Sequence, residues 1–345
     1  MNFGYQSFRI FLVDTLNILP SAKAFPDQCA QVITDMDNSL NLPVFSDIKN
    51  IVVSGMGGSA LGGRVLNYLE RQALNYPVTV STEYYLPNFV NHDSLVIISS
   101  YSGNTAETLF SLEEAIKRQA RIFILTGGGK LAQKATDLNL PGYIFKPVNN
   151  PSGQPRMGLG YSLTAIIRLL VMGKLMSSPP DFNDLPKYLK SRQQPEAGNR
   201  LAQALTGKIP VLVSSEHLKG AVHCLKNQIN ETAKNFCVAF DLPELNHHLM
   251  EGLAFPAANP QNLHFVFFES RHYHPELQKR YPVTKDVLTK QHIGFSDFQV
   301  SGPSPVFEVF ELIQAGGFLS YSLSQLNNVD PGPIPWVDYF KDRLK

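Results

Sequence analysis

Residues 50–63 read Asn-Ile-Val-Val-Ser-Gly-Met-Gly-Gly-Ser-Ala-Leu-Gly-Gly, a short apolar run that passes into a glycine-rich turn. This order predicts a buried strand, a tight turn and the start of a helix. Gly55, Gly57 and Ala60 also match a relaxed dinucleotide-binding pattern, and Glu83 could then bind a ribose. Two alternatives stay open here. The glycines could only allow close packing, or Ser59 and free N–H groups could face a sugar.

The same alternation of strand and helix continues on the carboxyl side of this turn. Besides residues 51–54, the strand-like runs are 78–81, 95–99, 122–125 and 142–145, and helical spacing covers 61–73 and 105–119. Continuous apolar strands that alternate with helices of this length predict a parallel sheet with helices on both faces.

The pattern restarts after a polar, proline-rich connector at residues 177–195. The predicted strands are then 209–214, 238–240 and 263–269, and the predicted helices are 218–234 and 306–326. We therefore expect an α/β protein with two architecturally similar units, residues 1–180 and 181–345. Ligands of such sheets bind at the carboxyl ends of the strands.

Composition excludes several classes of protein. The 345 residues carry 30 Lys and Arg against 29 Asp and Glu, so the chain lacks the positive charge of a general nucleic-acid binder. Three cysteines without a CxxC pair suit the cytoplasm better than a disulfide scaffold or structural zinc. Residues 1–14 do not resemble a signal peptide. Residues 159–176 contain Arg168 and Lys174, so we expect a buried helix and no contact with a membrane.

A hydroxyl-rich loop follows the predicted strand 95–99. Residues 99–108 read Ser-Ser-Tyr-Ser-Gly-Asn-Thr-Ala-Glu-Thr, and Asn104 with Glu107 has the spacing of a capping box. Hydroxyls, free N–H groups and a helix N-terminus at one point indicate a phosphate monoester site. The alternative is a serine-rich turn with a helix cap. The loop lacks the GK[ST] of a Walker A motif.

These residues resemble the phosphate loop of the sugar isomerase (SIS) domain family. With GMGGSALGG, PRMGLGYS, NETAK and ELNHH in the same order, the chain more narrowly resembles the bifunctional phosphoglucose/phosphomannose isomerases. The resemblance implies two SIS-type domains, each a mostly parallel, flavodoxin-like sheet between helices, and a reaction without cofactor or metal. It assigns the substrate phosphate and the sugar to six residues: Ser100, Ser102 and Thr105 for phosphate, and Gly57, Gly58 and Ser59 for sugar.

The resemblance also implies four catalytic residues. Arg156 would stabilise an enediolate, and Glu231 would move a proton between C2 and C1. His247 would open the sugar ring, entering the site from the neighbouring subunit of a homodimer, and Lys341 would assist. Considered alone, Arg156 could be a helix cap or ion-pair residue, Glu231 could pair with Lys234 on a solvated helix, and His247 and Lys341 could be surface residues.

One segment departs from the family pattern. Residues 329–336 read Val-Asp-Pro-Gly-Pro-Ile-Pro-Trp, without the threonine that helps family members accept both sugar epimers. The resemblance therefore implies glucose 6-phosphate more firmly than mannose 6-phosphate. An amino-sugar phosphate isomerase and a non-catalytic sugar-phosphate sensor remain the alternatives. Histidines at 264, 272, 274 and 292 are a poor metal signal and are expected at the surface.

Overall fold

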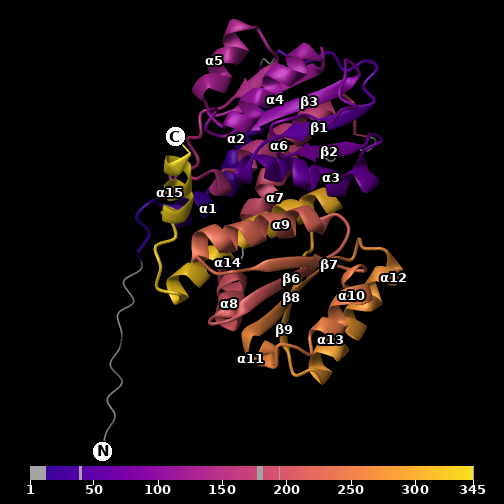
Figure 1. The fold of residues 1–345 in the computed structure, drawn as a ribbon, viewed down its shortest axis with the longest axis vertical. Coiled ribbons are helices and arrows are strands. Elements are labelled where there is room, and N and C mark those ends of the chain that lie inside the picture. Colours follow the sequence, from indigo (N-terminus) through magenta and orange to yellow (C-terminus); the bar gives the residue numbers. More distant parts are fainter. Residues whose placement is uncertain (1–12, 39–40, 177–181, 194, 345) are drawn as a thin grey trace, which may run out of the picture.

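The computed structural model describes residues 13–38, 41–176, 182–193 and 195–344. The first half confirms the predicted parallel sheet, with strand order β2-β1-β3-β4-β5 (Figure 1). Its strands are β1 (Asn50–Ser54), β2 (Val78–Ser81), β3 (Ser94–Ser100), β4 (Arg121–Thr126) and β5 (Gly142–Ile144). This is the doubly wound, flavodoxin-like order. Most of residues 1–14, for which we expect no signal peptide, lie outside the described part of the chain.

Helices cover both faces of this sheet because its strands are apolar on both faces. Val52, Val96 and Ile98 face α4 (Ala106–Lys117) and α5 (Gly129–Asp137). Ile51 and Val53 belong to the core on the other face, formed with α2 (Phe25–Asn38), α3 (Leu61–Ala73) and α6 (Leu159–Met172). The predicted buried helix at 159–176 is confirmed as α6, which ends at Met172, four residues earlier than predicted. The short α1 (Ile18–Lys23) precedes α2.

The second half contains a four-stranded parallel sheet of order β7-β6-β8-β9. Its strands are β6 (Ile209–Ser214), β7 (Val238–Asp241), β8 (Leu263–Glu269) and β9 (Gly294–Gln299). We did not predict β9, because this edge strand is mostly polar or exposed and lacks an apolar run. The helices are α8 (Pro195–Leu205), α9 (Leu218–Gln228), α10 (Leu245–Gly252), α11 (Asn259–Asn262), α12 (Pro275–Gln278), α13 (Arg280–Lys290) and α14 (Pro305–Leu326).

The connector is partly helical. It contains a single 3-10 turn, η3 (Phe182–Asp184), and α7 (Leu185–Ser191), while residues 177–181 and 194 lie outside the described residues. The two sheets are joined by close packing of α3 against α9. A Cβ on Gly220 of α9 would lie 2.5 Å from Cα of Val65 in α3, so only glycine permits this contact. One continuous apolar core runs from the first sheet into the second.

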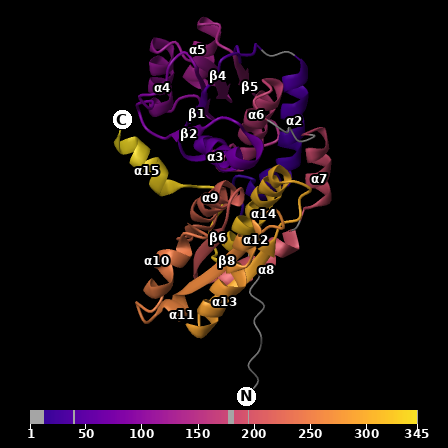
Figure 2. The same cartoon turned by 90° about the vertical axis from the view of Figure 1, so that its right-hand side faces the viewer.

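The chain ends in α15 (Pro335–Arg343), which has no buried residue. Figures 1 and 2 show it as an outlying helix, joined by an extended segment to α14 and lying beside the first half of the chain. Within the described ranges, no helix has the length and apolarity that crossing a bilayer requires.

Candidate active site

The hydroxyl loop lies at the carboxyl end of β3, where the sequence places a phosphate site. Ser100 is buried; its hydroxyl donates to Oγ1 of Thr105 at 3.1 Å and accepts from N of Gly103 at 3.1 Å. Thr105 is the N-cap of α4, and its side chain makes no capping hydrogen bond. The first-turn N–H groups of a helix have no acceptor within the helix. Hydroxyls and a helix N-terminus therefore face one point, as an anion requires.

The predicted capping box at Asn104 is wrong. Gly103 adopts a left-handed φ of 69°, and the cap falls one residue later, on Thr105. Asn104 instead accepts from N of Lys130 through Oδ1 at 3.1 Å, and its own N donates to Oγ of Ser102 at 3.3 Å. The side chain of Asn104 thus ties the loop after β3 to the glycine turn after β4.

The glycine turn after β1 contacts the hydroxyl loop directly. It begins with a 3-10 turn, η1 (Gly57–Ala60), in which Gly57 has a φ of 50°. Oγ of Ser59 accepts from N of Tyr101 at 2.9 Å. A Cβ on Gly58 would lie 3.1 Å from the carbonyl carbon of Pro155. Close packing accounts for Gly58, and the Ser59 hydroxyl supports the hydroxyl loop.

Arg156 lies in a 3-10 turn, η2 (Pro155–Met157), and is only 1% exposed. Its guanidinium donates from Nε to Oγ1 of Thr232 at 3.1 Å and from Nη1 to Oε1 of Gln154 at 2.7 Å. Nη2 donates to the carbonyls of Pro331 at 2.8 Å and Gly332 at 2.7 Å. Burial lowers the pKa of Arg156, and Glu231 partly offsets this. A guanidinium held in this way is a fixed positive charge.

Glu231 lies next to this guanidinium, 75 positions further along the chain. The predicted helix 218–234 ends as α9 at Gln228 and continues as a π-helical turn, η4 (Ile229–Ala233). Oε2 of Glu231 lies 3.6 Å from Nη1 of Arg156, and its side chain is 32% exposed. Burial raises the pKa of Glu231, while Arg156, Lys234 and Lys341 oppose the rise. A carboxylate with a raised pKa beside a fixed cation can accept and return a proton.

Lys234 is a functional candidate that the sequence did not identify. Its Nζ donates to the backbone carbonyls of Glu231 at 2.7 Å and Pro331 at 3.3 Å, so it does not form the surface side-chain pair that we considered. Burial first, and then Arg156, lower its pKa to about 8. The left-handed φ of 54° at Lys234 ends the π turn and aims the ammonium back at the site. The NETAK motif, which contains Lys234, is the sequence feature that could have identified this lysine as a candidate.

Lys341 borders the same region from α15. It lines a cavity of about 600 Å³ together with Ser102, Gly127–Gly129, Gln154 and Pro155. Its side chain is exposed, and its charge acts on Glu231. The structure therefore brings together Ser100, Ser102, Thr105, Gly58, Arg156, Glu231 and Lys341.

His247 does not join this group. It lies in the first turn of α10, in the second half of the chain, and is exposed. Both views place α10 apart from α15 (Figures 1 and 2). No hydrogen bond or ion pair links His247 to Arg156 or Glu231 among the described residues.

The segment without threonine is part of the site's wall. Gly332 and Pro331 supply the carbonyls that Arg156 binds, and N of Gly332 donates to Oδ1 of Asp330 at 3.0 Å. A Cβ on Gly332 would lie 2.7 Å from Cβ of Leu16. Leu16 thus fills the space that a side chain at position 332 would need.

Comparisons with known proteins show which family the chain belongs to. Residues 195–344 match the family model for the bacterial phospho-glucose isomerase C-terminal SIS domain. A bifunctional phosphoglucose/phosphomannose isomerase of Caldicellulosiruptor bescii is 32% identical, over 86% of this chain and 90% of that protein. One of Aquifex aeolicus is 31% identical, over 86% and 91%.

Among solved structures, a hypothetical protein of Thermus thermophilus matches with a TM-score of 0.72 at 14% identity. The match covers 95% of this chain and 90% of that one, and at this identity it speaks for the fold alone. The matches to these sequence relatives extend over most of both chains. The chain belongs to the family of bifunctional phosphoglucose/phosphomannose isomerases.

Proposed function

We propose that this protein catalyses reversible aldose–ketose isomerisation of hexose 6-phosphates, with glucose 6-phosphate as the first substrate and mannose 6-phosphate as the second. The observation that carries the proposal is the Arg156–Glu231 pair, 3.6 Å apart, beside a loop that presents hydroxyls and a helix N-terminus. The names of the sequence relatives support the substrate class.

In this proposal Ser100, Ser102 and Thr105 hold the phosphate, and Gly57, Gly58 and Ser59 border the sugar. His247 and Lys341 move protons at the ring oxygen and the anomeric hydroxyl, which opens the ring. Glu231 then takes the proton from C2, leaving a cis-enediolate whose negative charge Arg156 stabilises, and a proton moves from O2 to O1 through the cis-enediol. The protonated Glu231 returns the proton to C1, so no net proton is consumed.

The position of His247 favours a homodimer. Because His247 is exposed and no hydrogen bond or ion pair joins it to Glu231 among the described residues, we propose that ring opening by His247 needs a second subunit. We propose that it enters the neighbour's site. We also place the boundary between the two units near residue 180. The buried free thiols of Cys29, Cys224 and Cys237 suit a cytoplasmic enzyme.

The test is a coupled assay of the purified protein on glucose, mannose and glucosamine 6-phosphates. The proposal predicts turnover of glucose 6-phosphate to fructose 6-phosphate and its loss in Glu231→Gln. Turnover of glucosamine 6-phosphate alone would favour an amino-sugar isomerase, and binding without turnover would favour a sensor. Fluorescence quenching by micromolar NAD(H) would revive the dinucleotide interpretation of the glycine turn.

A further inference from the structure

The two sheets repeat each other in register as well as in strand order. In the first sheet Val53 of β1 pairs with Ile97 of β3, and in the second Val213 of β6 pairs with Phe267 of β8. Likewise Ser54 pairs with Ser81, and Ser214 with Asp241. Three residues beyond Ile97 lies Ser100, and three residues beyond Phe267 lies Ser270. These two serines therefore occupy equivalent positions at the carboxyl edges of their sheets.

Ser270, like Ser100, accepts a hydrogen bond from a backbone N–H of the loop that follows its strand. Oγ of Ser270 accepts from N of His272, two residues on, at 2.9 Å, and Oγ of Ser100 accepts from N of Gly103, three residues on. The Ser270 hydroxyl, however, donates to Oε2 of Glu308 at 2.5 Å. Glu308 is fully buried in the first turn of α14, the helix that follows β9. The first sheet has no counterpart of Glu308 in the turn after β4, because this turn consists of glycines, which have no side chain.

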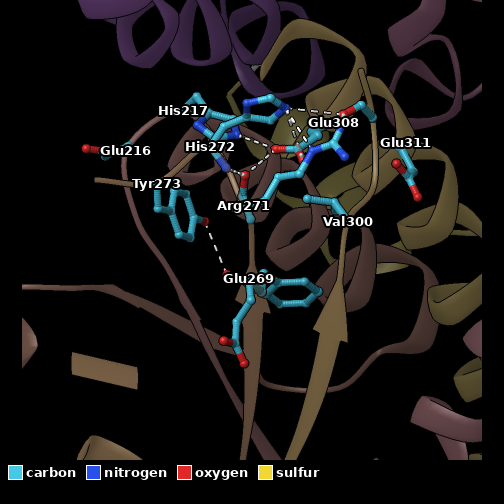
Figure 3. Close-up of polar contacts among 12 residues, drawn as sticks. Glu216, His217, Glu269, Arg271, His272, Tyr273, Val300, Glu308 and Glu311 are labelled. Carbon is cyan, nitrogen blue, oxygen red and sulfur yellow. Dashed lines mark hydrogen bonds and ion pairs between the residues drawn. The ribbon is translucent and has the colours of Figure 1, made fainter. Parts of the chain in front are cut away.

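The loops that follow β1 and β6 also differ, and this difference places a side chain on the other side of Glu308. Three residues after Ser54 comes Gly57, whereas three residues after Ser214 comes His217. Nε2 of His217 lies 2.8 Å from Oε2 of Glu308, and both side chains are 0% exposed. Figure 3 shows Glu308 between His217 and the loop that carries Arg271 and His272.

The surroundings of Glu308 are those of an anion site. Besides Ser270 and His217, Nε2 of His272 lies 4.0 Å from Oε1 of Glu308, and this oxygen has no hydrogen-bond partner in the described structure. Nη2 of Arg271 donates to the carbonyl of Gly302 nearby, at 3.3 Å. One hydroxyl and two imidazoles therefore face a single carboxylate, with a guanidinium beside them.

We infer that the carboxyl edge of the second sheet is a second anion-binding site whose anion is the chain's own Glu308 carboxylate. This carboxylate lies where the first sheet would bind a substrate phosphate, a comparison that rests on the proposed role of Ser100. Each chain then binds sugar phosphate at the first sheet alone. A small carboxylate such as formate fits the second site once the Glu308 side chain is removed.

The test removes the internal anion and supplies an external one. In Glu308→Ala, formate at ten times its Kd is expected to raise Tm by roughly 2 °C more than in wild type. Glu308→Gln, which keeps the volume filled, should gain no more than wild type. Adding Ser270→Ala to Glu308→Ala should abolish the gain. Equal shifts in all four proteins, or the same shift with chloride at equal ionic strength, would overturn the inference.

If Glu308→Ala accumulates unfolded, its refolding yield with formate and with chloride replaces Tm, and a yield independent of formate counts against the site. Calorimetry of the wild-type protein gives the complementary measurement. One hexose phosphate per chain agrees with the inference, and two contradict it. Failure of the proposed isomerase function would leave the formate response of Glu308→Ala intact, so the two failures are distinguishable.

Discussion

Replacing Arg156 by lysine keeps the positive charge and removes the planar fork that the structure uses. The guanidinium donates four hydrogen bonds of 2.7–3.1 Å, two of them from Nη2 to the buried carbonyls of Pro331 and Gly332. An ammonium cannot reach both of these acceptors together with Thr232 and Gln154. Losing two bonds to a charged donor costs about 3 kcal/mol, which lowers Tm by about 4 °C in a chain of this length.

The catalytic effect of Arg156→Lys is expected to be separate from this loss of stability. Removing a positioned donor to a developing oxyanion lowers kcat by about 10²–10³, and the retained charge places this variant near the lower value. The assay measures kcat and KM well below Tm. Arg118 is a matched control, because it donates to the carbonyls of Pro87 and Leu86 far from the site. Arg118→Lys should lose stability and keep its kcat.

A kcat for Arg156→Lys within about fivefold of wild type, a change of about 1 kcal/mol, would refute the role of Arg156 in stabilising charge. An equal loss in Arg118→Lys would also refute it, because the loss would then follow stability.

Three further predictions concern the pH dependence and the specificity of the site. Burial raises the folded-state pKa of Glu231, so the ionised carboxylate destabilises the fold at neutral pH and no longer does so below the ordinary glutamate pKa of about 4.3. Glu231→Gln should therefore have a higher Tm than wild type near neutral pH. A gain in Tm that grows as the pH falls would contradict this prediction. Lys341→Ala removes a charge that lowers the pKa of Glu231, so the acid limb of the kcat/KM profile should move to higher pH, whereas Arg343→Ala on the same helix should leave it in place. Gly332→Thr combined with Leu16→Ala should raise the mannose-to-glucose activity ratio severalfold, by about 1 kcal/mol, and an unchanged ratio would show that this position does not control the epimer.

Most of the fold follows from local sequence patterns. The strands 78–81, 209–214 and 263–269 have the predicted bounds because short runs rich in apolar and β-branched residues, bounded by turn residues, favour a parallel strand. The edge strand β9 has no such run, and pairing with β8 determines it. The cap of α4 moved from Asn104 to Thr105 because the left-handed turn at Gly103 depends on its contacts with the turn after β4.

The site was less accessible to sequence reasoning. Arg156 and Glu231 are brought together only by the packing of both halves, and spacing within the helix favoured a solvated Glu231–Lys234 pair. The π turn that buries Glu231 and aims Lys234 at backbone carbonyls leaves no pattern of apolar residues. The roles of Arg156 and Glu231 were therefore expected only from the resemblance of their motifs to a known family. The close approach of Leu16 to Gly332 depends on the three-dimensional structure and has no sequence signal.

The most direct test of the central proposal follows the proton itself. Glucose 6-phosphate deuterated at C2 is converted by the wild-type protein and by Glu231→Gln, and deuterium at C1 of the fructose 6-phosphate is measured by mass spectrometry. We expect transfer to C1, with part of the label lost to water, in the wild type, and turnover reduced by about 10³ or more in Glu231→Gln with substrate binding retained. Transfer from C2 to C1 at more than a few per cent of the wild-type rate in Glu231→Gln would show that another group is the base.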